Sequence, residues 1–327
     1  MLMANTQLTA RQHEEGIQAP PTEIKMILAA IDGSRNSDDA LHLAAQIAQR
    51  FSAQVDLVHV HSMPAELVGM PASGSALHPL TPQTKSSTVE QRELARTLIL
   101  EDEAMLLDRK KWLQGRQIRS EEISVSLEKS SSIGDEIARV CKEGNYDFVA
   151  LGNRGQSGVR SFFLGSVSKK VASDASCSVL ISKNSNEQIQ RILLAYDGSP
   201  GSKKALMMAA ALARRFGAVV NVVSAISNRM LSSEVVVSTA VEAMEEEMRY
   251  YGNEAKSKLN ELGVNSEEPK ILGSIEISKA IAEEAGNGFY DLVVLGNRGW
   301  GKARYFFLGS TASGVVDLSR TNVLIVK

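Results

Sequence analysis

The chain has 327 residues, of which 43% are hydrophobic and 23% charged, and its formal net charge is −2. This length favours two domains of about 150 residues each, and the composition is that of a folded globular protein. The near-neutral charge argues against a nucleic-acid binder, because such a protein needs surplus Lys and Arg to neutralise phosphates. No apolar run approaches the ~18–20 residues of a membrane span, so we expect no membrane partner either.

The start of the chain and its cysteines both bear on location. Residues 1–22 are polar and include Pro20-Pro21 but not the apolar stretch of a secretory signal, so we predict a disordered N-terminal segment. Cys141 and Cys177 lack the spacing of a disulfide framework and indicate buried thiols in a reducing compartment. We therefore expect a cytoplasmic protein.

Short apolar runs alternate with helical periodicity along the rest of the chain. Residues 26–31 form a continuous apolar run, typical of a parallel strand buried on both faces. Such alternation predicts a parallel sheet with helices on both sides. The predicted elements that follow are a helix over 40–51, a strand over 55–61, a long loop over 62–87, helices over 89–113 and 133–143, and strands over 148–151 and 179–181.

Two segments of the first half recur in the second half. The sequence MILAAIDGS at 26–34 returns as ILLAYDGS at 192–199, and YDFVALGNRG at 146–155 returns as YDLVVLGNRG at 290–299. A repeat of this length indicates a duplicated domain. We predict a first domain over residues 23–183, a linker over 184–190 and a second domain over 191–327.

A glycine-rich loop follows the predicted fourth strand of each copy. Its residues are Gly152, Gly155, Gly165 and Ser166 in the first copy and Gly296, Gly299, Gly309 and Ser310 in the second. Glycine lets the backbone approach a ligand closely, and the helix expected after each Gly-Ser pair offers unpaired N–H groups to phosphate. Arg154 and Arg298 lie between the glycines, where they either screen phosphate charge or are merely solvated. The alternative reading is that the glycines only make turns.

These motifs together resemble the universal stress protein family. The shared pattern is Gly-x2-Gly-x9-Gly-Ser after a Leu-Gly strand end, with an opening strand that ends in Asp-Gly-Ser, and it extends over nearly the whole chain, twice. The resemblance implies two tandem flavodoxin-like α/β domains, each a five-stranded parallel sheet with helices on both faces. It also implies ATP binding, with or without Mg²⁺, and pairing of the two domains through their last strands. Whether two chains form a homodimer stays open.

The resemblance further implies which residues line the two nucleotide sites. In the first copy these are Ala30 and Asp32 near the adenosine, Val60 beside the adenine, and Leu151, Gly152, Gly155, Gly165, Ser166 and Val167 around the ribose and phosphates. In the second copy they are Ala195, Asp197, Ala225, Leu295, Gly296, Gly299, Gly309, Ser310 and Thr311. For the two aspartates the alternative is a role confined to capping the next helix or defining the turn.

The chain departs from the family pattern in two respects. Family members often have Pro just before the last strand, where this chain has Ser178 and Asn322; this affects the turn and not the phosphate site. Ser224 stands in the second copy where the first has His59, so we expect the adenine side of the second site to differ. The first site is accordingly ranked above the second for nucleotide binding.

His59 and His61 alternate along a predicted strand and therefore share a face, as a metal-binding pair would. Zinc sites need at least three protein ligands, and no third ligand is evident near this pair in the sequence. We therefore predict no metal site.

The leading functional hypothesis is an adenine-nucleotide-binding protein that acts in stress response or signalling through nucleotide occupancy. A slow ATPase or nucleotidyl transferase is one alternative, although no general base is evident beside the phosphate loop. A nucleotide-free interaction module is the other.

Overall fold

The computed structural model describes residues 23–61, 89–127, 131–155, 164–185, 188–227, 237–300 and 308–327. The predicted disordered segment at 1–22 and the predicted loop at 62–87 lie outside these residues. Among the described residues, no helix combines the length and apolar character needed to cross a membrane.

Each copy alternates strands and helices in the predicted order. The first copy contains β1 (Met26–Ala30), α2 (Arg35–Phe51), β2 (Gln54–His61), α3 (Val89–Gln114), β3 (Glu122–Ser126), α4 (Ile133–Gly144), β4 (Phe148–Gly152), α5 (Ser166–Asp174) and β5 (Ser178–Ser182). The second copy contains β6 (Arg191–Ala195), α6 (Pro200–Phe216), β7 (Val219–Ser227), α7 (Val237–Glu261), β8 (Lys270–Ser274), α8 (Ile277–Asn287), β9 (Leu292–Gly296), α9 (Ser310–Leu318) and β10 (Asn322–Val326).

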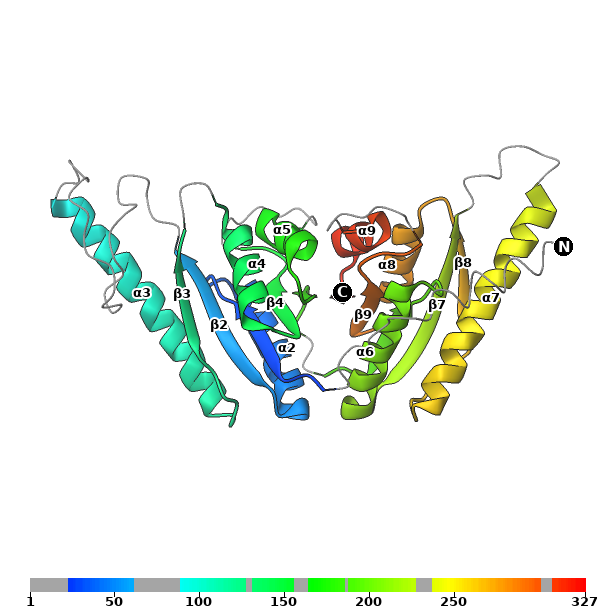
Figure 1. Cartoon of the computed structure of the whole chain (residues 1–327), viewed down its shortest axis with the longest axis horizontal. Helices are drawn as coiled ribbons and strands as arrows, with labels where there is room; N and C mark the ends of the chain where they lie inside the picture. Colours follow the sequence, from blue (N-terminus) through cyan, green and yellow to red (C-terminus); the bar gives the residue numbers. More distant parts are fainter. Residues whose placement is uncertain are drawn as a thin grey trace.

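The two copies share one ten-stranded sheet with the strand order β3-β2-β1-β4-β5-β10-β9-β6-β7-β8. All neighbouring strands within a copy are parallel, and the copies join where β5 and β10 pair antiparallel, with Leu180 opposite Leu324. The two five-stranded sheets expected from the strand–helix alternation therefore form one continuous sheet. They join through their last strands, as the family resemblance implies. Figure 1 shows the copies side by side, with α3 and α7 at the outer edges and α5 and α9 nearest the centre.

Side chains at the ends of the last strands connect the copies further. Lys183 donates from Nζ to the carbonyl of Val316, at the C-terminal end of α9, with a distance of 2.7 Å. Lys327 donates in the same way to the carbonyls of Ser173 and Ala175, at the C-terminal end of α5. Each lysine thus links the end of the last strand of its own copy to a helix end of the other copy.

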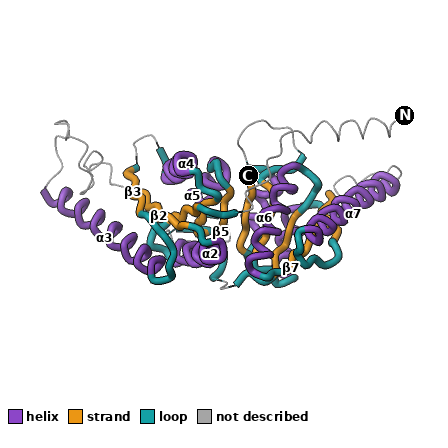
Figure 2. The backbone as a smooth tube through the Cα atoms, turned by 60° about the horizontal axis from the view of Figure 1, so that its bottom comes forward, coloured by secondary structure: helices purple, strands orange, loops and turns teal. Residues whose placement is uncertain are grey.

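The sheet is buried on both faces, as the continuous apolar strands predict. One face packs against α2, α3, α6 and α7, and its apolar core runs without a break from the first copy into the second. The other face packs against α4, α5, α8 and α9 and contains the buried thiols of Cys141 and Cys177. Figure 2 shows the helices on either side of the strands. Successive strand residues alternate between the two faces, so Leu57 contributes to the first core and Val58 to the second.

Candidate functional site

The predicted site residues lie at the point where the strand order reverses in each copy. The chain runs from β1 to its neighbour β2 on one side, and returns later to place β4 on the other side of β1. In open α/β sheets this reversal leaves a crevice at the carboxyl ends of the strands, where ligands bind. Asp32 follows β1 and Gly155 follows β4, so the two predicted motifs flank the crevice.

The Asp-Gly-Ser motif after β1 forms a tight turn into α2. Gly33 has a φ of 77°, the left-handed conformation that favours glycine. The Ser34 backbone N–H donates to Asp32 Oδ1 at 3.0 Å, while the Ser34 hydroxyl caps the helix by accepting from the Ser37 N–H at 3.2 Å. Of the alternatives considered for Asp32, capping therefore belongs to Ser34, and Asp32 defines the turn through one oxygen.

The second carboxylate oxygen of Asp32 lies against the glycine loop. A Cβ atom added to Gly155 would lie 2.5 Å from Asp32 Oδ2, and one added to Gly299 would lie 2.5 Å from Asp197 Oδ2. A side chain at either glycine would therefore displace the aspartate. Gly152 approaches the backbone of Asn36 at the start of α2, where an added Cβ would lie 2.7 Å from the carbonyl carbon. The first two loop glycines thus serve close approach of neighbouring segments.

The helices that follow the loops start without a side-chain cap. Gly165 is the N-cap of α5 and Gly309 the N-cap of α9, so in the described residues neither helix has an N-cap side chain that bonds to its first N–H groups. By contrast α2, α4 and α6 are capped by serine hydroxyls; α8 also lacks such a cap. The Ser168 hydroxyl donates to the carbonyl of Gly152 at 2.7 Å and holds α5 against the strand end. The first N–H groups of α5 and α9 therefore keep their capacity to bind an anion.

A cavity of about 110 Å³ lies at this crevice in the first copy. The predicted residues that line it are Ala30, Asp32, Val60, Leu151, Gly152, Arg154, Gly155 and Val167. Gly165 and Ser166 do not line it; they lie next to it at the start of α5, where the Gly165 N–H donates to the Asn153 carbonyl at 2.8 Å. The cavity is smaller than the ~300–1,000 Å³ typical of ligand pockets, so a whole nucleotide would extend beyond it or displace its lining.

Sequence reasoning missed several lining residues, namely Ile31, Ser37, Val58, His59, Ile133, Ile137 and Ser168. The alternation along β2 was a signal for Val58, because it shares a face with Val60. No sequence signal connects the residues of α4 with this crevice, since only the packing of the helix on the sheet brings them there.

The second copy repeats this arrangement with local differences. Ala195 and Ala225 lie on β6 and β7, Leu295 and Gly296 end β9, Asp197 and Arg298 lie in the adjoining turns, and Ser310 and Thr311 begin α9. The Ser224 hydroxyl donates to the carbonyl of Tyr196 at 2.7 Å, whereas in the first copy His59 Nδ1 contacts the equivalent carbonyl of Ile31 at 2.6 Å. The two copies thus differ in the side chain that contacts this carbonyl. Trp300 is 60% exposed, and its ring N–H donates to the Asp197 carbonyl at 2.8 Å.

Two buried lysines add positive charge beside the loops. Burial lowers the pKa of Lys183, which directly follows β5, to about 8; Asp317 opposes this shift and Arg154 adds a smaller part of it. Burial also lowers the pKa of Lys327, with a smaller contribution from Arg298. Each loop arginine therefore contributes a small effect that disfavours the charged form of the lysine after the last strand of its own copy.

The histidine pair of β2 has the third neighbour that the sequence did not indicate. Asp102 of α3 lies 2.8 Å from His61 Nδ1 and 3.2 Å from His59 Nε2, measured from its Oδ2 atom. Sequence reasoning missed this third candidate ligand. The reason is the distance along the chain: a helix residue 41 positions after His61 reaches the pair only once α3 has packed on β2.

Comparison with known proteins agrees with this architecture. The model of the universal stress protein family matches residues 23–183 and again residues 188–327. A universal stress protein of Thermus aquaticus is 31% identical over 157 residues, covering 48% of this chain and 97% of its own length. A universal stress protein of Methanocaldococcus jannaschii is 28% identical over 167 residues, covering 50% of this chain and 85% of its own length.

Solved structures show the same two-copy fold. A universal stress protein from Archaeoglobus fulgidus superposes with a TM-score of 0.61 at 21% identity, covering 95% of this chain and 99% of that one. A functionally unknown protein from Pseudomonas aeruginosa superposes with a TM-score of 0.64 at 18% identity, covering 94% and 93%. The fold and the two strand-end loops define a tandem flavodoxin-like protein. The chain belongs to the universal stress protein family, as a member with two copies of the family domain.

Proposed function

We propose that the chain binds an adenine nucleotide, ATP in the first instance, at the first-copy crevice and at its second-copy equivalent. Nucleotide occupancy, rather than turnover, would then couple the protein to stress response or signalling. The observation that carries the proposal is the approach of Gly155 to Asp32 beside the uncapped start of α5. This places a carboxylate, a glycine loop and a helix N-terminus around one crevice, each suited to a different part of a nucleotide.

The chemistry of each part supports the assignment. Phosphate would accept hydrogen bonds from the first N–H groups of α5, where the helix dipole also favours negative charge. The Arg154 side chain lines the cavity and would face the same charge. Asp32 Oδ2 would accept a ribose hydroxyl, while Val58 and Val60 offer an apolar surface to a base. If Mg²⁺ accompanies the nucleotide, the nucleotide phosphates and water would supply most of its ligands.

The direct test is the identity of any nucleotide held by the purified full-length chain. Nucleotide released by heat is identified by mass spectrometry, and ATP, ADP and AMP affinities are then measured by calorimetry. We expect Gly155→Ala to weaken ATP binding at the first site by at least tenfold, because the methyl group displaces Asp32. Gly286→Ala is the matched control, since an added Cβ there meets no atom within 4 Å.

Two outcomes separate this proposal from the alternatives. Release of phosphate from ATP above a protein-free control, abolished by Asp32→Asn, would favour the slow ATPase. Absence of nucleotide after purification, together with no measurable ATP affinity for wild-type protein, would favour the nucleotide-free interaction module. Equal affinities for wild type and the Gly155→Ala, Gly299→Ala double variant would place any nucleotide elsewhere.

A further inference from the structure

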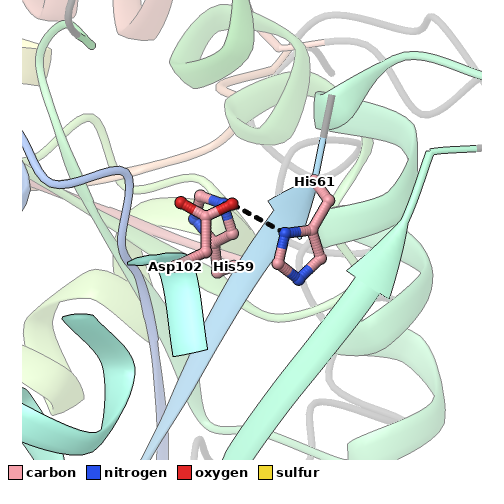
Figure 3. Close-up of side chains that lie close together, drawn as sticks. All are labelled: His59, His61 and Asp102. Atoms are coloured by element: carbon pink, nitrogen blue, oxygen red, sulfur yellow. Dashed lines mark hydrogen bonds and ion pairs between the residues drawn. The ribbon is translucent and has the colours of Figure 1, made fainter. Parts of the chain in front are cut away.

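The side chains of His59, His61 and Asp102 converge at the end of β2 in the first copy. Figure 3 shows His59, His61 and the Asp102 carboxylate close together, with a dashed line that marks the contact between Asp102 and His61. One nitrogen of each histidine and one oxygen of Asp102 lie within 4.8 Å of one another. The histidine side chains are 11% and 4% exposed and that of Asp102 is 32% exposed, so the cluster is shielded on the strand side and open beside the helix.

The far nitrogen of each ring is already engaged. His59 Nδ1 lies 2.6 Å from the carbonyl oxygen of Ile31, which can only accept, so this nitrogen carries a hydrogen and donates it. His61 Nε2 contacts the hydroxyl of Ser124 on β3. Metal-binding histidines almost always donate their second ring N–H to a carbonyl or another oxygen, which orients the ring and fixes the tautomer. Both rings have such an outer partner.

The His59 contact with Asp102 requires a cation or a proton between the two groups. With its hydrogen on Nδ1, a neutral His59 presents a lone pair at Nε2, and this lone pair lies 3.2 Å from Asp102 Oδ2. Two acceptors at this distance repel each other unless a proton or a metal ion separates them. A metal ion bound between these atoms would be held by His59 Nε2, His61 Nδ1 and Asp102 Oδ2 at once.

The second copy shows that the fold itself does not need this cluster. Ser224 and Ile226 replace the histidines, and the Ser224 hydroxyl alone satisfies the carbonyl equivalent to that of Ile31. The residue of α7 that is equivalent to Asp102 is found by aligning the backbone hydrogen bond that follows each helix. Ile118 donates this bond to Leu113 in the first copy, and Val264 donates it to Leu259 in the second. In that register Met248 occupies the position of Asp102. The second copy thus has the same backbone but none of the three ligand side chains.

We propose that His59, His61 and Asp102 form a zinc-binding site that is specific to the first copy. Two imidazoles and one carboxylate are a ligand set that Zn²⁺ accepts with a fourth, open position for water. Bonds of about 2.0–2.2 Å in tetrahedral geometry place neighbouring ligand atoms about 3.4 Å apart. The contacts with Asp102 measure 3.2 Å and 2.8 Å, and the two histidine nitrogens lie within 4.8 Å of each other. Zn²⁺ would displace any proton held between these atoms into solvent, so binding would release protons. His59 also lines the first-copy cavity, but the zinc proposal does not rest on nucleotide binding.

The test is metal binding by the full-length chain in nucleotide-free buffer. Protein treated with chelator and dialysed is titrated with ZnCl₂ against a chromophoric chelator, and we expect one strongly bound Zn²⁺ per chain. Co²⁺ serves as the spectroscopic probe, because coordination by histidine nitrogens in a four-coordinate site gives visible absorption bands. His59→Ser, His61→Ile and Asp102→Met introduce the residues of the second copy, and each should weaken Zn²⁺ binding by at least about 100-fold. Ser124→Ala should weaken it about 10–100-fold, as removal of an outer partner does.

The control variant replaces His42, which stacks on Trp112 away from the cluster, with Gln and should bind Zn²⁺ as tightly as wild type. A second control replaces His13 and His78 with Gln and should also leave the affinity unchanged. The proposal is overturned if wild-type protein gives no Co²⁺ absorption bands and takes up no Zn²⁺. It is equally overturned if Asp102→Met or the histidine variants bind as wild type does, or if a control variant loses the metal. Circular dichroism of each variant establishes that it is folded.

Discussion

The side-chain oxygen of Asn322, in the second copy, accepts a hydrogen bond of 2.8 Å from the backbone N–H of Lys183, in the first. Asn322 is 1% exposed, and its amide nitrogen donates to Asn184 Oδ1 at 2.9 Å and to the Asp291 carbonyl at 3.1 Å. This position, which departs from the proline common in the family, therefore ties the last strand of one copy to the end of the last strand of the other. The departure concerns the junction and not only a turn.

Replacing this amide should weaken the junction. We expect Asn322→Ala to lower the free energy of unfolding by about 1–3 kcal/mol, because it removes the hydrogen bonds that this buried amide makes to part-buried backbone groups of Lys183 and Asp291. Urea unfolding followed by circular dichroism measures the change. Asn260→Ala, at an exposed position of α7, should change stability by less than about 0.5 kcal/mol. Equal effects of the two variants would contradict the role given to Asn322.

A second buried polar contact holds the first copy together. The Tyr146 hydroxyl donates to Asp56 Oδ2 at 2.9 Å, and both residues are buried. Tyr146→Phe should cost about 1–3 kcal/mol, since one carboxylate oxygen loses its buried donor. Its second-copy counterpart, Tyr290, lies 3.5 Å from Glu284, and Tyr290→Phe should cost less. A larger thermal destabilisation by Tyr290→Phe than by Tyr146→Phe would refute this ranking.

Lys183 should make stability depend on pH in the alkaline range. Its folded pKa of about 8 lies below the unfolded value of 10.5, so the unfolded chain binds more protons between these values. The cost of burying its charge is fully present below pH 8 and disappears as the pH rises towards 10.5. Relative to Lys183→Met, wild type should therefore gain stability over this window. Parallel urea titrations from pH 7 to 10 measure the difference, and a constant difference would show that the lysine is not buried in its charged form.

Trp300 provides a reporter for the second site. It is one of only two tryptophans, and its ring N–H donates to the carbonyl of Asp197 in the turn that flanks the second crevice. If nucleotide binds there, we expect ATP to change the emission of a Trp112→Phe variant, in which Trp300 is the only tryptophan. Adding Gly299→Ala should abolish the change, whereas adding Gly155→Ala should preserve it. A response lost with Gly155→Ala instead would assign the signal to the first site.

The sequence by itself determined the strands, the helices and the duplication, because these depend on local periodicity and on motifs that recur. The glycine loop indicated Gly155 and the family resemblance implied Asp32, and the structure brings the two together because β1 and β4 are neighbours at the point where the strand order reverses. The motif itself does not indicate that one Asp32 oxygen forms the turn while the other faces Gly155.

Only the tertiary structure decided which distant residues meet. Asn322 bonds to Lys183 because β5 and β10 pair antiparallel, a register that no local pattern specifies. Asp102 lies in a charged helix, and the sequence does not distinguish it from the other acidic residues of that helix. The packing of α3 on β2 places its carboxylate beside His59 and His61. Local periodicity indicates that a helix has a buried face, but the partner of each residue on that face depends on how the helix is placed on the sheet.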